Sequence, residues 1–148
     1  MKKMKKGTLL DREHHVMRHI PWTRLRRDAD DNVIGFLPQA FELREAERAL
    51  SVNWVEYHDS GSGDAKVACV KTFRGMLDIK KKSAFGVGNV GKIGDIRGST
   101  GKSIRTIYSP TNANKSHSLM QGKPIEELAV QEMLATEIFA QLIKNSDI

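Results

Sequence analysis

Residues 50–55 read Leu-Ser-Val-Asn-Trp-Val, residues 60–64 read Ser-Gly-Ser-Gly-Asp, and residues 65–77 read Ala-Lys-Val-Ala-Cys-Val-Lys-Thr-Phe-Arg-Gly-Met-Leu. The first stretch alternates apolar and polar side chains, which indicates a half-buried strand. The second is a flexible break that ends in Asp64, a residue type that favours the N-cap of a helix. The third spaces its apolar residues as an amphipathic helix does. A strand followed directly by a helix in this way favours a domain of the α+β class.

The flanking segments complete this prediction. Residues 22–26 and 33–43 are expected to form a hairpin around the turn Asp28-Ala29-Asp30-Asp31-Asn32, because Asp and Asn bond to their own backbone in tight turns. Residues 84–93 and 104–108 are expected to be extended, residues 111–117 a polar loop, and residues 125–144 the longest helix. The order predicts an α+β fold with a small mixed sheet, an N-terminal hairpin, one middle helix and a long C-terminal helix. Residues 1–7 are expected to be a disordered basic tail before a single domain at 8–148.

The charge of the chain suggests a polyanionic partner. Lys and Arg number 24 against 18 Asp and Glu in 148 residues, which gives a formal net charge of +6. The lysine-rich first six residues supply four of these charges. Two further basic clusters lie at residues 18–27 and at Lys80, Lys81 and Lys82. A basic surplus of this kind is typical of proteins that bind nucleic acid or a nucleotide, although charge runs are often only solvated surface.

Several features indicate the cytoplasm. The chain has one cysteine, Cys69, so it cannot form an internal disulfide. It has no run of about 18 apolar residues that could cross a membrane. Its basic start lacks the apolar core of a secretory signal.

Three glycine or acidic motifs are present but lack their usual context. Gly86, Gly88 and Gly91 match the spacing of a dinucleotide loop, yet further glycines follow where a helix is needed, so a bulged or tightly approached strand and loop are expected instead. Residues 98–103 resemble a phosphate loop without its first glycine. Residues 28–39 begin like a calcium loop, but Val33 and Gln39 stand at its glycine and glutamate positions.

The histidines His14, His15 and His19 lie close together, but no second cysteine and no His-Glu-x-x-His motif accompany them. No metal and no cofactor are therefore expected.

The candidate site residues are polar side chains with no evident structural task. His117 stands between hydroxyl residues in the predicted loop, and histidine is the side chain that titrates near neutral pH. Ser51 and Asn53 lie on the polar face of the predicted strand, where they could also simply face water. Gln39 lies in a Pro-Gln-Ala-Phe segment, and Arg24 lies in the first arm of the hairpin.

Four short elements occur in a particular order. They are Arg24 in an extended arm, Pro38-Gln39-Ala40-Phe41, Leu50-Ser51-Val52-Asn53-Trp54, and Asn114-Lys115-Ser116-His117. Over roughly residues 19–123 this order resembles a family of small uncharacterised bacterial proteins with Gln-Ala-Phe, Leu-Ser-Val and Asn-x-x-His elements. The family often has proline where this chain has Lys115. The resemblance brings no activity with it, but it implies that Arg24, Gln39, Ser51 and His117 belong to one site.

Two classes of function remain open. The first is an enzyme that acts on RNA, DNA or a nucleotide, nuclease-like or toxin-like, or a nucleotide-using transferase. Its expected catalytic residues are His117, Ser51 and His19, and its expected substrate-binding residues are Arg24, Gln39, Asn53 and Lys102. The second is a non-catalytic binding or assembly module of a multi-protein complex.

The C-terminal helix predicts a protein partner. One of its faces would carry Ile125, Leu128, Ala129, Phe139, Leu142 and Ile143, and the opposite side would carry Val130, Leu134 and Ile138. A helix that is apolar all round is normally buried. A homodimer or another protein is therefore expected to cover the second side.

Overall fold

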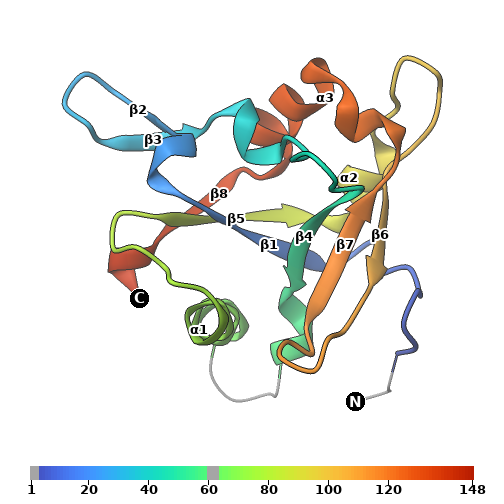
Figure 1. Cartoon of the computed structure of the whole chain (residues 1–148), viewed down its shortest axis with the longest axis horizontal. Helices are drawn as coiled ribbons and strands as arrows, with labels where there is room; N and C mark the ends of the chain where they lie inside the picture. Colours follow the sequence, from blue (N-terminus) through green and yellow to red (C-terminus); the bar gives the residue numbers. More distant parts are fainter. Residues whose placement is uncertain (1–3, 60–63) are drawn as a thin grey trace.

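The computed structural model describes residues 4–59 and 64–148. Within them a six-stranded sheet has the strand order β6-β7-β4-β1-β5-β8, and β2 and β3 form a separate two-stranded sheet (Figure 1). The strands are β1 His15–Ile20, β2 Leu25–Arg27, β3 Val33–Phe36, β4 Ala49–Trp54, β5 Ala84–Asn89, β6 Arg105–Tyr108, β7 His117–Gln121 and β8 Gln141–Lys144. The helices are α1 Ala65–Met76, α2 Val90–Asp95 and α3 Leu128–Met133. The predicted α+β class is confirmed, and every strand pair is antiparallel.

The two faces of the large sheet bury different clusters of side chains. One face contributes residues such as Leu50 and Val52 to the larger core, which α3 and the 3-10 turn η2 (Pro38–Phe41) help to enclose. The other face contributes Met17 and Phe85 to a smaller core beneath α1. Figure 1 shows α3 and α1 on opposite sides of the sheet. The strict alternation of residues 50–54 is thus the alternation between these two faces.

Helix α1 confirms the predicted middle helix almost to the residue. The carboxylate of Asp64 caps it by accepting a hydrogen bond from the Lys66 amide at 2.9 Å. Its buried side chains are Cys69, Val70 and Phe73. The predicted hairpin is also present as β2 and β3, and the Asp28 carboxylate bonds to the amides of Asp30 and Asn32 in the turn.

The C-terminal helix is shorter than predicted. After α3 a π-helical turn spans Leu134–Ile138, and the chain then enters β8, so Leu142 and Ile143 lie in a strand. Val130 and Leu134 are buried in the chain's own core, against η2 and its neighbours. The apolar side of the helix that a partner was expected to bury is therefore buried by the chain itself. The partner stays a prediction.

Gly86 and Gly88 lie in a closely approached strand, as expected, whereas Gly91 lies in the helix α2. A Cβ at Gly86 would lie 2.9 Å from the Phe36 ring, and one at Gly88 would lie 3.1 Å from the Phe139 ring. The strand ends at Asn89, whose side chain accepts from the Lys92 amide and starts the short α2. Residues 90–93, predicted to be extended, are thus helical.

The N-terminal segment is described from Met4, and residues 1–3 of the predicted tail lie outside the described residues. The Gly7 amide donates to the Tyr108 carbonyl at 2.7 Å, so the segment contacts β6. None of the helices in residues 4–59 and 64–148 combines the length and the apolar composition that a membrane crossing requires.

Candidate functional site

His117 and Ser51 face each other on neighbouring strands. His117 Nε2 lies 3.2 Å from Ser51 Oγ, and His117 Nδ1 lies 2.7 Å from the main-chain carbonyl of Ser109. A carbonyl oxygen can only accept, so Nδ1 must carry the proton of the neutral ring. Nε2 is then the unprotonated nitrogen, and it accepts a hydrogen bond from the Ser51 hydroxyl. This tautomer is the one in which histidine can withdraw a proton from serine.

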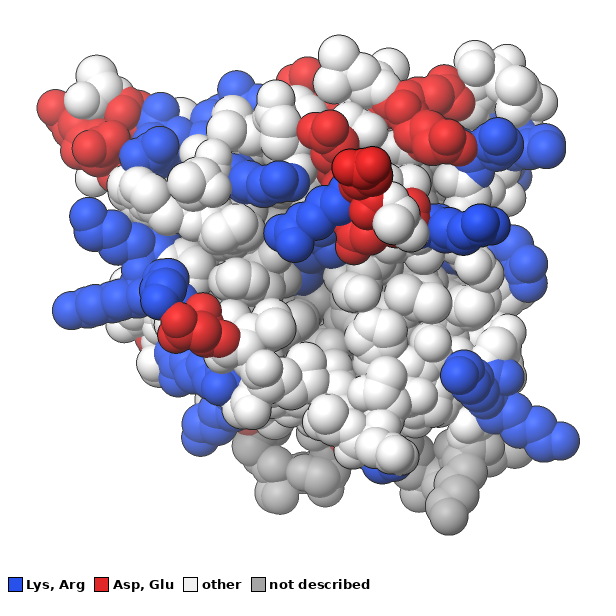
Figure 2. Space-filling model, viewed as in Figure 1, with Lys and Arg blue, Asp and Glu red and all other residues white. Residues whose placement is uncertain are grey.

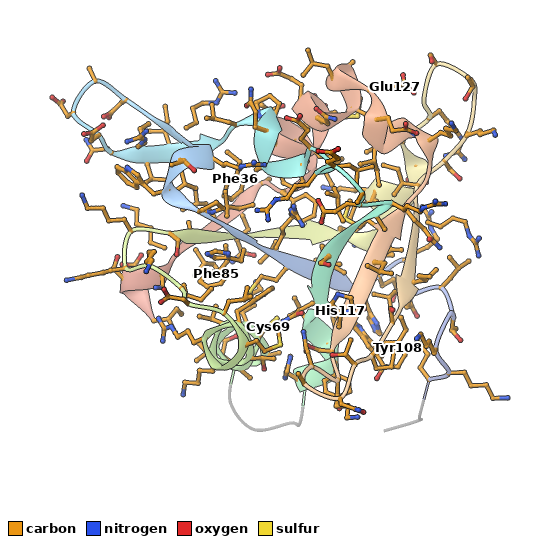
Figure 3. All side chains as sticks on the ribbon, viewed as in Figure 1. Phe36, Cys69, Phe85, Tyr108, His117 and Glu127 are labelled. Carbon is orange, nitrogen blue, oxygen red and sulfur yellow. The ribbon has the colours of Figure 1, made fainter. Side chains whose placement is uncertain are left out.

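The sheet register produces this pair. Asn53 on β4 pairs with His117 on β7, and Ser51 pairs with Leu119, so His117 and Ser51 are diagonal neighbours on one face. Ser51 is exposed, and the buried side chains of α1 pack on the half of the sheet formed by β1, β5 and β8. Figure 3 shows His117 over β4 and β7, to one side of Cys69 on α1. The hydroxyl and the imidazole therefore lie at the uncovered half of the sheet.

His117 was predicted to lie in a loop, and this was wrong. It is the first residue of β7, where Ser118 and Met120 are buried and the alternate side chains are partly exposed. The strand is held between β4 and β6. A strand position fixes the ring more firmly than a loop would.

Asn53, expected either to bind substrate or to face water, does neither. Its side chain is only 1% exposed, and its Oδ1 accepts from Asn114 Nδ2 at 2.7 Å. Asn114 Oδ1 in turn accepts from the amide and hydroxyl of Ser116. Asn53 also lies beside the Cys69 thiol, whose pKa burial raises to about 12 against the opposing effect of that amide. This buried polar network shapes the loop before His117 and leaves Asn53 unavailable to a substrate.

Arg18 fills the place where two strands separate. β1 pairs with β5 along all six of its residues, but it pairs with β4 only at Val16 and Met17. Beyond that point the Arg18 guanidinium donates to the Ser51 carbonyl at 2.8 Å and to the Ala40 carbonyl at 2.8 Å. The side chain thus replaces the missing strand pairing and reaches the residue that carries the hydroxyl.

Arg24 and Gln39 join the same set of contacts. The Arg24 guanidinium donates to the main-chain carbonyl of Gln39, next in sequence to Ala40. Both residues were predicted to lie in strands of the hairpin, and neither does. Arg24 ends the 3-10 turn η1 (Trp22–Arg24) and Gln39 lies in η2, because Pro21 and Pro38 suit the start of such turns better than a ladder. Arg24 and Arg18 are therefore linked through the Gln39–Ala40 backbone on the η2 side of the sheet, whereas the Ser51 hydroxyl and His117 lie on the other face.

The arginines are not neutralised by carboxylates. Among residues 4–59 and 64–148, no acidic oxygen lies within 4.0 Å of the Arg18 or Arg24 guanidinium. Burial lowers the pKa of Arg18 to about 10, Glu47 opposes this, and the charges of Arg44 and Arg24 add to it. Arg18 still keeps its charge at neutral pH. Arg18 is half-buried, and a cation with like charges around it would be stabilised by an anion.

His19 and Lys102, two further candidates, lie away from this set. The His19 ring packs with Phe73 and Phe85, and its Nε2 is buried without a hydrogen-bond partner in the described structure. Burial and the charge of Arg18 lower its pKa. Lys102 borders a different pocket with Glu127, and Figure 3 shows Glu127 at the opposite end of the sheet from His117.

Arg18 is the site residue that sequence reasoning missed. It stands two residues from Val16 and from Ile20, both fully buried on the same face of β1. A charged residue at every-second-residue spacing among apolar ones therefore indicates a cation that needs buried partners. Residues 8–20 nevertheless carry no clear pattern, since they could begin a helix while Pro21 favours extended geometry for His19 and Ile20.

His14, just before β1, and His15, the first residue of β1, each contact a side chain of the protein. Trp54 Nε1 donates to His14 Nδ1 at 3.1 Å, and His15 Nδ1 lies 2.7 Å from Glu56. Within the part of the chain that the structure describes, no group of three or more His, Cys, Asp or Glu side chains is arranged to hold a metal ion.

Comparison with protein-family models, with curated proteins and with solved structures finds no match to this chain. The resemblance to a family of small bacterial proteins stays a prediction, and the function has to be argued from the geometry of the site.

Proposed function

We propose that the protein is an enzyme that transfers or hydrolyses a phosphate ester of RNA, DNA or a nucleotide, with Ser51 as nucleophile and His117 as general base and then acid. The observation that carries this proposal is the 3.2 Å contact between His117 Nε2 and Ser51 Oγ, with the opposite ring nitrogen on a carbonyl. That arrangement holds the imidazole in the tautomer that can accept the serine proton.

The reaction would run in two steps. In the first, the Ser51 proton passes to His117 Nε2 while Oγ forms a bond to phosphorus and the bond from phosphorus to the leaving oxygen breaks. His117 then returns the proton to that leaving oxygen. In the second, a water or an acceptor hydroxyl gives its proton to His117 and attacks phosphorus, and Ser51 is released with its proton restored. Water yields hydrolysis, and another hydroxyl yields a transferase.

The arginines would supply positive charge to the site. Arg18 donates to the Ser51 main-chain carbonyl from the face of the sheet opposite to Ser51 Oγ, so its charge would act across the strand that carries the attacking residue. Arg24 and Arg44 add positive charge around Arg18, with Glu47 as the opposing carboxylate. Charge held in place before the reaction lowers the cost of developing negative charge on phosphate oxygens. We place this activity in the cytoplasm, because Cys69 is a buried free thiol that needs no oxidising compartment.

The test is turnover of end-labelled RNA, single-stranded DNA, nucleoside triphosphates and NAD, each with and without chelator. Ser51→Ala and His117→Ala are each expected to reduce kcat by at least about 100-fold, the range of acid–base catalysis. Arg24→Gln should mainly raise KM. Lys102→Gln is the matched control, since that cation lies in another pocket and should leave turnover unchanged.

A second readout concerns the bond itself. Substrate labelled on the reacting phosphorus should leave label on the wild-type protein after a rapid acid quench, and none on Ser51→Ala. If His117→Ala keeps full turnover, or if Ser51→Ala retains both turnover and label, the proposed chemistry is wrong. Saturable binding without turnover of any of these substrates would instead support the binding module.

A further inference from the structure

We propose a second phosphate-binding site, in a cavity of about 420 Å³ formed by Trp22, Lys81, Lys82 and Lys144 at the edge where β1 and β8 end and β5 begins. Ala84, the first residue of β5, pairs with Ile20, the last residue of β1, and with Lys144, the last of β8. The residues just beyond these strand termini are therefore brought to one place. The proposal is independent of the chemistry at Ser51 and His117.

The backbone around the cavity is held by hydrogen bonds. The amide and hydroxyl of Ser83 both donate to the Lys80 carbonyl, at 3.0 and 2.6 Å. The Asn145 amide donates to the Ser83 carbonyl at 3.0 Å, and Asn145 Nδ2 donates to the Lys80 carbonyl at 3.1 Å. The turn before β5 is thus tied to the end of β8, which fixes the origins of the lysine side chains.

The three lysines of the cavity have no acidic partners among the described residues. Across the described residues, no carboxylate oxygen lies within 4.0 Å of the ammonium groups of Lys81, Lys82 or Lys144. Asp31 also lines the cavity, but it is 3.6 Å from Arg27. Figure 2 shows blue side chains gathered at the left edge of the molecule, where the turn before β5 and the end of β8 lie in Figure 1. The cavity therefore carries an excess of positive charge.

The Trp22 ring lines the cavity and contacts two of the cations near it. The Lys82 ammonium lies 5.1 Å from the centroid of the Trp22 ring, and the Arg27 guanidinium lies 4.3 Å from it. Contacts of this kind orient a long cationic side chain over an aromatic surface. Lys82 is thereby held close to the cavity in the absence of a ligand.

The ligand that this chemistry fits is a phosphate group. Ammonium groups bind phosphate as point charges, and the Ser146 hydroxyl and the second hydrogen of Asn32 Nδ2, whose first donates to Asp28, can add hydrogen bonds at the cavity edge. The volume is in the range of small-molecule sites and suits a nucleotide. A free nucleotide and one nucleotide of a single strand share this chemistry, and the experiment separates them.

The probes are inorganic pyrophosphate, uridine 5′-monophosphate and a twelve-residue oligouridylate. Binding is followed at 50 mM salt by the fluorescence of Trp22 in a Trp54→Phe background. If that background does not fold, the indole resonance of Trp22 in the wild-type protein, assigned with Trp22→Phe, replaces it. A saturable change is expected with pyrophosphate and at least one nucleotide probe. Tighter binding of the oligouridylate than of the monophosphate identifies a strand as the source, and equal binding identifies a free nucleotide.

The matched control lies in the same run of lysines. Lys80 is paired with Asp78 at 2.6 Å and does not line the cavity. Lys82→Gln is expected to weaken binding of each probe roughly tenfold, as the loss of one charge-assisted contact does, whereas Lys80→Gln should change it less than about twofold. No saturable signal with any probe, or equal weakening by the two variants, overturns the proposal. Because the signal comes from Trp22, it does not depend on turnover at Ser51.

Discussion

Arg18 and Ser51 are joined by a hydrogen bond of 2.8 Å from a guanidinium to a main-chain carbonyl, at the point where β1 and β4 cease to pair. The strand backbone that presents the serine hydroxyl is thus held by a cation from the face of the sheet that carries Val16 and Ile20, whereas the hydroxyl lies on the other face. Figure 2 shows positive and negative side chains above the centre of the molecule and a largely uncharged surface below them.

The first prediction concerns the charges around Arg18. Glu47→Gln removes the carboxylate that favours the charged guanidinium, but it keeps an acceptor for the Arg44 amide. It should lower the free energy of unfolding by about 0.2–1 kcal/mol. Arg44→Gln removes a like charge and should raise that free energy by a similar amount. Urea unfolding at low ionic strength measures both, and salt should shrink both effects. Changes of the same sign would contradict the electrostatic account.

A second prediction concerns the buried amide network. Asn114→Ala removes the partners of Asn53 Oδ1 and of the Ser116 amide and hydroxyl, all inside the protein. Polar groups left buried without partners should lower the free energy of unfolding by about 2–3 kcal/mol. Asn112→Ala makes the same substitution at an exposed position of the same loop, so this control should stay within about 0.5 kcal/mol of wild type. Chemical denaturation of the two variants side by side decides whether the network stabilises the fold.

The pH dependence of stability should contain a contribution from His19. Burial, and next the charge of Arg18, lower the pKa of His19 in the folded protein below its ordinary value of 6.5. As the pH falls below about 6.5, the unfolded chain binds a proton that the folded chain refuses, so the free energy of unfolding decreases. Above that pH His19 is neutral in both states, so it causes no loss of stability there.

The variant that isolates this contribution is His19→Phe, which keeps a ring against Phe73 and Phe85 and removes the titration. Urea unfolding at pH 7.5 and pH 5.0 should show a smaller loss of stability in the variant than in the wild type. Burial also lowers the pKa of His58, which is unchanged in both proteins and leaves a residual slope. An equal loss in the two proteins would show that His19 does not titrate as expected.

Two glycines should respond to alanine with opposite signs. A Cβ on Gly86 would lie 2.9 Å from the ring of Phe36, which is itself buried against Phe41, so Gly86→Ala should cost about 1–3 kcal/mol. A Cβ on Gly75, inside α1, would meet nothing within 4 Å, so Gly75→Ala should add up to about 1 kcal/mol through helix propensity. Thermal unfolding of the two variants tests this, and a neutral Gly86→Ala would mean that the contact is not tight.

The elements predicted best are those with a local signature. α1 was predicted from its N-cap and its apolar spacing, and β4 from its alternation, because both patterns are complete within one segment. β7 escaped prediction because its strand character depends on β4 and β6 on either side of it, not on its own composition. The end of α3 was missed for the same reason. Residues 141–144 form a strand because they pair with β5, and the Phe139 ring just before them packs against Gly88 of β5.

The site was predictable in its exposed polar residues and not in its buried ones. Ser51 and His117 were singled out by residue type, and the β4–β7 register then brings them into contact. Asn53 has the same residue chemistry and the same strand face, yet it is buried in a network with Asn114, which no single-sequence pattern reports. Arg18 shows the converse, because only the separation of β1 from β4 explains why a cation stands on an apolar face.

The strand order has a consequence for how fast the chain can fold. β1 at residues 15–20 must find β5 at residues 84–89, and β5 must then find β8 at residues 141–144, so the half of the sheet beneath α1 is assembled from segments far apart in sequence. The chain loses the entropy of closing these long loops before the stabilising contacts between the strands form. Domains dominated by such distant strand pairings fold on the order of milliseconds to seconds. Until β8 has been synthesised, β5 has an open edge that another chain could pair with. Slow closure of that edge would leave β5 open to pairing with another chain during refolding.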